Sequence, residues 1–226
     1  MSEINILFQG QKLTQSKFNE IEGFVLKYFS LLWKNIRESI NTLRQNNYKL
    51  LKSEVCLAFI GADSLSRFRE IITTGEEKEN NNENRFREWF DDFVFNDRND
   101  IYKKYKTEID CDSSTAWKLR NSLLHFYGLP KSKLVGFSTY NQVFIKNFKK
   151  VVSSKYSGQQ VRMINPYRLI EAILDGFLTQ AKTLAQMIES GDDKQKEIYA
   201  EGIVKCYEII QNEGSVFASS EKVKND

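Results

Sequence analysis

The chain has 226 residues, of which 41% are hydrophobic and 28% are charged, and its formal net charge is +3. This apolar content is enough to bury a core, and it excludes a chain that is disordered throughout. Basic and acidic residues nearly balance, at 33 and 30. That balance is compatible with nucleic-acid binding but does not indicate it, because such binding sites are concentrated basic patches.

Several classes of protein are disfavoured by what the sequence lacks. It contains no run of about 18 apolar residues, so we expect no membrane association. The first residues do not have the basic start and apolar core of a signal peptide. Three cysteines, odd in number and widely spaced, are typical of reduced thiols in a cytoplasmic protein. A single histidine without paired cysteines disfavours a zinc site, and we expect neither metal nor cofactor.

Apolar residues recur at three- and four-residue steps through most of the chain, which predicts helices. We expect them at residues 14–46, 49–73, 85–94, from the caps at 112–115 to about 127, 166–188 and 194–211, with short helix and loop mixed at 96–112. Residues 74–84 (TGEEKENNNEN) are polar and rich in asparagine, and predict a mobile surface loop.

The period changes after Pro130. Short β-like runs separated by Ser, Asn and Gly predict a small β-hairpin insertion at about 133–164. Asn165 and Pro166 then form a cap and first-turn pair for the first of two C-terminal helices. The sequence therefore predicts an all-α helical bundle in a single domain, residues 1–226. Residues 1–13 form an N-terminal extension in this reading, and residues 213–226 a polar tail.

The stretch Ser114–Pro130, STAWKLRNSLLHFYGLP, contains the only histidine in the chain, His125. On a helical wheel one side of this stretch is apolar and predicts a core face, formed by Ala116, Leu119, Leu123 and Phe126. Asn121 and His125 are neighbours one turn apart on another flank. A polar flank of this kind is also what an ordinary solvated helix edge would show.

Arg120 and His125 lie about 140° apart around the helix axis, so one helix presents them on adjoining flanks. For both to act on one phosphate, either the long arginine side chain reaches round the helix or a second copy of the helix completes the site. A two-fold dimer provides the second arrangement, because the same patch then meets itself. We therefore expect a homodimer.

The segment RNSLLH, which closes an amphipathic helix in an all-helical chain, resembles the motif of the HEPN superfamily. That motif has an arginine, then a polar residue, then a histidine after four to six intervening residues. Tyr127 extends the match to the Arg-x4-His-x-Tyr form of HEPN toxins that pair with nucleotidyltransferase antitoxins. The preceding FIGADSLSRF and RFREWFDDF segments agree with a HEPN-like bundle, and the resemblance covers roughly residues 50–188. The greater length of this chain and its β-like insertion depart from the small toxins.

The resemblance implies a metal-independent ribonuclease in a toxin–antitoxin or phage-defence setting. Arg120 and His125 match the catalytic pair, and Asn121 matches the polar position. Asp63 matches an upstream acidic residue that orients the pair in some members, although pairing with Arg67 or capping at the core edge would explain it equally well. Tyr127 matches a tyrosine that the antitoxin modifies with AMP, and aromatic packing is its alternative role. The implied partners are RNA, a second copy of the chain, and an antitoxin or regulatory protein.

Two other functions remain open from the sequence. A non-catalytic HEPN-like module could bind RNA, a nucleotide or a protein through the same groove, and an unrelated helical interaction protein would use its aromatic residues only as core. The sequence disfavours other enzyme classes, because it has no glycine-rich phosphate-binding loop, no G-x-G-x-x-G dinucleotide-binding motif and no G-x-S-x-G nucleophile motif of serine hydrolases.

Overall fold

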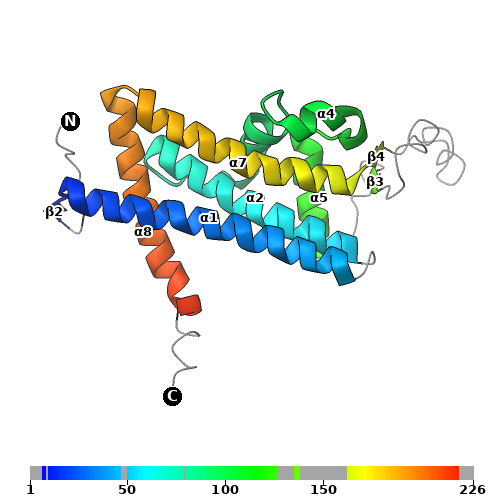
Figure 1. Cartoon of the computed structure of the whole chain (residues 1–226), viewed down its shortest axis with the longest axis horizontal. Helices are drawn as coiled ribbons and strands as arrows, with labels where there is room; N and C mark the ends of the chain where they lie inside the picture. Colours follow the sequence, from blue (N-terminus) through cyan, green and yellow to red (C-terminus); the bar gives the residue numbers. More distant parts are fainter. Residues whose placement is uncertain are drawn as a thin grey trace, which may run out of the picture. The chain divides into compact units, whose positions relative to one another are not determined.

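The computed structural model describes residues 7–8, 10–46, 50–78, 80–126, 135–137 and 162–218. Most of these residues are helical, which confirms the all-α prediction and the pair of C-terminal helices (Figure 1). The α-helices are α1 (Gln15–Asn46), α2 (Leu51–Thr74), α3 (Asn82–Trp89), α4 (Asp100–Ile109), α5 (Ser113–Phe126), α7 (Pro166–Ser190) and α8 (Asp193–Ala218). None of the helices in the described ranges is long and apolar enough to cross a membrane.

The strands are short and form two separate pairs. β1 (Leu7–Phe8) and β2 (Gln11–Lys12) are antiparallel, whereas β3 (Val135–Phe137) and β4 (Arg162–Ile164) are parallel. The hairpin predicted at 133–164 is not confirmed, because the two arms of a hairpin run antiparallel. Residues 138–161 of that prediction lie outside the described residues.

The structure divides into two compact units, each built from separate stretches of chain. Unit 1 comprises residues 1–32, 67–80 and 183–226, and unit 2 comprises residues 33–66 and 81–182. Helices α1, α2 and α7 contribute residues to both units. The single domain predicted for residues 1–226 therefore stays a prediction.

Unit 1 has an aliphatic core that α8 closes. Gly202 of α8 faces the α2 backbone so closely that a Cβ atom there would lie 2.5 Å from the Ile71 carbonyl oxygen. Leu13 also packs into this core with only 6% of its surface exposed, so the predicted N-terminal extension ends in a core residue. The Tyr199 hydroxyl donates a hydrogen bond to Glu22 at 2.9 Å, and burial together with that carboxylate raises the pKa of Tyr199.

Unit 2 has an aromatic core. Trp89, Phe86, Phe90 and Phe59 are all fully buried, and the rings of Phe86 and Phe90 lie 4.6 Å apart. Gly61 of α2 leaves room for the side chains of Ile36 and Phe177, which would lie 2.3 and 2.9 Å from a Cβ atom at that position. Helix α5 packs against the α3 and η2 side of this core, where Trp117 contacts Phe86.

A π-helical turn, η2 (Phe90–Val94), follows α3 directly. Its widened geometry is completed by a hydrogen bond from the Phe95 N–H to the Phe90 carbonyl at 2.7 Å. The turn carries Asp91, whose carboxylate accepts a hydrogen bond from the Ser113 hydroxyl at 3.0 Å. The first residue of α5 is therefore tied to η2 by a side-chain hydrogen bond.

Two boundaries differ from the sequence prediction. Helix α3 begins at Asn82, inside the predicted loop 74–84. Helix α8 runs to Ala218 instead of ending near 211, so the first part of the predicted polar tail is helical. In each case a polar helix surface resembles a loop when read from composition alone.

Candidate functional site

Helix α5 is fixed at its start by a side-chain cap and along its length by one apolar face. The Asp112 carboxylate accepts a hydrogen bond from the Thr115 N–H at 2.6 Å, as an N-cap residue does. Ala116, Leu119 and Leu123 are at most 1% exposed, as the helical wheel predicts. The side chain of Phe126 lies outside the described residues.

Arg120 is held from three sides at the edge of α5. Its Nη2 donates to Oδ2 of Asp63 at 2.6 Å, and its Nη1 donates to Oδ1 of Asn121 at 2.9 Å. The guanidinium carbon also lies 5.1 Å from the centre of the Trp117 ring, one turn earlier on the helix. These contacts fix an arginine that the sequence alone leaves free to rotate.

Asp63 reaches Arg120 from α2, a helix that lies beside α5 in unit 2 (Figure 1). Only 26% of the Asp63 side chain and 18% of the Arg120 side chain are exposed, so the ion pair is half-buried. Arg67, the sequence alternative as a partner for Asp63, donates instead to both carboxylate oxygens of Glu77, at 2.7 and 3.0 Å.

The Asp63–Arg120 pair is only partly satisfied. Arg120 Nε and Asp63 Oδ1 are buried, and neither has a hydrogen-bond partner among the described residues. A guanidinium carries five N–H donors, two of them on each terminal nitrogen. Each terminal nitrogen makes one of the two hydrogen bonds above, so one N–H on each remains for a ligand within the described part of the chain.

His125 lies in the last turn of α5, and its side chain is exposed. Asn121 lies one turn before it and is hydrogen-bonded to Arg120, so the amide stands between the arginine and the imidazole along the helix surface. The structure thus brings together Asp63, Arg120 and Asn121 and places His125 on the next flank. Tyr127, the remaining candidate, lies outside the described residues.

Trp117 is a neighbour of the site that the motif does not include. Its ring packs against Phe86, with the ring centres 5.4 Å apart, and it also contacts the guanidinium of Arg120. An aromatic residue three positions before an arginine on a helix is the sequence signal that could have identified it, because residues three apart share a face.

The three cysteines do not form a second reactive centre. Cys111 and Cys206 are buried and Cys56 is half-buried, and none of the three forms a disulfide within the described part of the chain. Burial raises the pKa of the Cys206 and Cys56 thiols, which lowers their thiolate content at neutral pH. Within the described ranges, no group of three or more His, Cys, Asp or Glu side chains could hold a metal ion.

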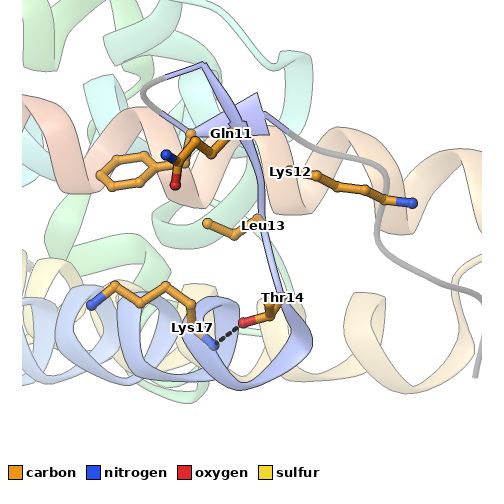
Figure 2. Close-up of a pocket in the computed structure, with 6 residues that line it drawn as sticks. Gln11, Lys12, Leu13, Thr14 and Lys17 are labelled. Carbon is orange, nitrogen blue, oxygen red and sulfur yellow. Dashed lines mark hydrogen bonds between the residues drawn. The ribbon is translucent and has the colours of Figure 1, made fainter.

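A pocket of about 380 Å³ lies beside the β1–β2 pair in unit 1, and none of the candidate residues above lines it. Figure 2 shows that the ammonium groups of Lys12 and Lys17 point in opposite directions. Lys17 is in addition paired with Glu20 at 2.9 Å, and the Thr14 hydroxyl accepts a hydrogen bond from the Lys17 N–H (Figure 2). Because its polar groups do not converge, the pocket is a poor candidate for a ligand site.

Comparison with known proteins adds no relative. No family model matches the chain, and no curated protein and no solved structure matches it significantly. The residues around Arg120 are therefore the basis for a functional proposal.

Proposed function

We propose that the protein is a metal-independent endoribonuclease of HEPN type, with Arg120 and His125 as its catalytic residues. The observation that carries this proposal is the arrangement around Arg120. Its guanidinium is oriented by Asp63 and Asn121 and retains N–H donors, and an exposed histidine lies on the next flank of the same helix. A fixed cation and a proton-transfer group that both reach one phosphate are what cleavage of a phosphodiester needs.

RNA carries its own nucleophile in the 2′-hydroxyl group. Its oxygen attacks the adjacent phosphorus, a new O2′–P bond forms, and the P–O5′ bond breaks. His125 accepts the 2′-hydroxyl proton, and a second acid protonates the departing O5′. Arg120 stabilises the negative charge on the phosphorane oxygens, and the products are a 2′,3′-cyclic phosphate and a 5′-hydroxyl.

A second copy of the chain would supply the group that one copy lacks. The base and the acid must lie on opposite sides of the phosphorus, and the chain contains one histidine. In a two-fold dimer, His125 of one copy acts as the base and the partner copy's histidine acts as the acid. The homodimer is part of the proposal, as is a regulatory partner protein that covers this surface in a toxin–antitoxin or phage-defence setting.

The test uses purified protein and a fluorescent RNA in buffer with EDTA. Wild type should cleave the RNA and leave 2′,3′-cyclic phosphate ends, which mass spectrometry identifies. Removing the proton-transfer group in His125→Ala should lower the rate by about 100-fold or more. Removing the charge in Arg120→Ala should lower the rate by about 100- to 1000-fold.

Lys182→Ala, at an exposed position of α7, serves as the control and should cleave at the wild-type rate. Activity per chain should also fall on dilution, at the concentration where light scattering shows the dimer dissociating. Absence of cleavage by wild type, or equal cleavage by His125→Ala, would contradict the proposed function.

One observation favours a second function, a non-catalytic module that binds RNA, a nucleotide or a protein. The Asp63 carboxylate already neutralises Arg120, as in a structural ion pair. The exposure of His125 argues the other way, because a purely structural pair does not require it. RNA binding without cleavage, unchanged by His125→Ala, would support this second function.

A further inference from the structure

Helix α5 differs in charge from every other α-helix that the structure describes. Its sequence, SSTAWKLRNSLLHF, contains no aspartate or glutamate, whereas each of the other described α-helices contains at least one. The basic side chains of α5 include Lys118, which is exposed and has no ion-pair partner among the described residues. The polar flanks of α5 therefore present positive charge and hydrogen-bonding groups to solvent.

Lys118 lies on the same flank as His125. The two residues are seven positions apart, which places them two turns apart on one side of the helix. Asn121 and Ser122 lie between them on this flank, and both are half-buried. We call these four residues, Lys118, Asn121, Ser122 and His125, the α5 polar stripe.

Lys118 lacks the acidic neighbours with which some other surface lysines pair. Lys17 and Lys34 lie near Glu20 and Glu38, at 2.9 and 3.8 Å, three and four positions along their helix. The positions three and four residues from Lys118 on α5 hold serine, threonine and asparagine. Its charge is therefore available to an anion from outside the helix.

We propose that a single strand of RNA lies along the α5 polar stripe, with Lys118 binding a backbone phosphate upstream or downstream of the one that His125 acts on. This inference rests on the proposed function, because it treats His125 as the cleavage position. Seven residues of α-helix rise about 10.5 Å. A stacked strand rises about 3.4 Å per nucleotide, so Lys118 binds a phosphate about three nucleotides from the scissile one.

If RNA binds along the α5 polar stripe, the contribution of Lys118 to binding and cleavage should depend on the length of the RNA. A dinucleotide has one internucleotide phosphate and cannot reach both residues. A strand of eight nucleotides reaches both, whichever direction it takes. Lys118 should therefore contribute to binding and cleavage of the longer strand and not to cleavage of the dinucleotide.

Binding is measured with an eight-nucleotide 2′-O-methyl RNA, which has no free 2′-hydroxyl and cannot be cleaved by the proposed route. Lys118→Ala should weaken its binding several-fold and reduce the slope of log affinity against log salt by about 0.7, the value for one phosphate contact on a single strand. Lys118→Arg should restore most of the affinity. Lys182→Ala is the matched control and should bind like wild type.

Cleavage is measured with an eight-nucleotide RNA and with a dinucleotide. Lys118→Ala should raise KM for the longer RNA several-fold and leave kcat/KM for the dinucleotide unchanged. An equal loss on both substrates would overturn the inference, since it would place Lys118 at the reacting phosphate or in the fold. Equal binding by Lys118→Ala and wild type would also overturn it.

The failure of this inference differs from the failure of the proposed function. If the protein cleaves RNA through His125 and Lys118→Ala has no effect, the proposed function stands and the binding of RNA along the α5 polar stripe is overturned. If the protein binds the eight-nucleotide strand through Lys118 but does not cleave RNA, the stripe stands as a binding surface and the proposed ribonuclease function is overturned. A wild-type protein that binds no RNA overturns both, and binding of an acidic protein through Lys118 instead would indicate the regulatory partner.

Discussion

Two polar clusters in unit 2 differ in how completely their hydrogen bonds are satisfied. Asn99 is fully buried and uses all its groups: its amide donates to the carbonyls of Phe93 and Ala172 at 2.9 and 2.8 Å, and its oxygen accepts from the Tyr102 N–H at 2.8 Å. Arg120 and Asp63 each retain one buried polar atom without a partner among the described residues.

The difference separates a polar group that stabilises the fold from one that is available for binding. A buried, saturated side chain such as Asn99 specifies one arrangement of its neighbours and has nothing left for a ligand. A half-buried and half-satisfied pair leaves donors and an acceptor that only a further molecule can use. Substitutions at the two clusters should therefore act on stability at the first and on activity at the second.

The largest effect on stability should come from Asn99→Ala. The substitution removes the donors to the Phe93 and Ala172 carbonyls and the acceptor for the Tyr102 N–H, which is the N-cap of α4. Each lost hydrogen bond at this buried site costs about 1 kcal/mol or more, so the free energy of unfolding should fall by about 3 kcal/mol or more. Urea denaturation followed by circular dichroism measures it.

Asn99→Asp is the control for this prediction. It keeps the oxygen that caps α4 but turns an acceptor toward the carbonyls of Phe93 and Ala172. If only the cap mattered, Asn99→Asp would be as stable as wild type. We expect a loss of stability at neutral pH close to that of Asn99→Ala.

Asp63→Asn should have a smaller effect on stability and a visible effect on catalysis. It replaces an ion pair by a hydrogen bond from the charged guanidinium to a neutral amide of similar shape, so the free energy of unfolding should fall by only about 1 kcal/mol. Cleavage should show kcat reduced by about 10-fold with KM unchanged or lower, because Arg120 keeps its charge and loses its orientation.

Glu171→Gln is the matched control for Asp63→Asn. Glu171 pairs with Arg168 at 2.7 Å, and the two side chains are 34% and 27% exposed, similar to the pair at Asp63. It should cost similar stability and leave kcat unchanged. If Asp63→Asn leaves kcat unchanged as well, Asp63 is a structural partner and not a positioning residue.

Trp117→Leu should have the smallest effect on cleavage. The substitution removes a cation–π contact with Arg120, worth about 0.5–1 kcal/mol at a partly exposed site, and the aromatic contact with Phe86, worth about 0.5–1.5 kcal/mol. In a chain of this size that lowers Tm by about 2–4 °C per kcal/mol. Cleavage should fall a few-fold, and Trp117→Tyr should recover it because a phenol ring still faces the guanidinium. A variant with lower Tm but full activity would place Trp117 in the fold alone.

The sequence was sufficient to predict the helices and the core face of α5, because short-range periodicity determines both. Ala116, Leu119 and Leu123 follow the helical repeat and are buried as predicted. The same periodicity placed Arg120 and His125 on adjoining flanks, whereas their choice as a candidate pair came from the resemblance to the HEPN motif.

Long-range contacts were not predictable in the same way. The Asp63–Arg120 contact joins residues 57 positions apart, and the sequence offered Arg67 as an equally good partner. The parallel pairing of β3 and β4 depends on how distant segments meet, and three-residue strands carry too short a pattern to indicate direction. Gly202 has no neighbouring glycine or proline to show that the α2 backbone approaches it.

The π-helical turn η2 has a consequence for insertions and deletions. A π-turn holds one more residue than the α-helical turn it replaces. The turn takes up this extra residue, so deleting one residue within 90–94 would restore an α-helical turn and leave the following chain facing in nearly the same direction. Inserting a further residue would instead rotate the following chain by about 100° relative to α3 and disturb the contact between Asp91 and Ser113. We therefore expect an insertion in this turn to be tolerated less well than a single deletion.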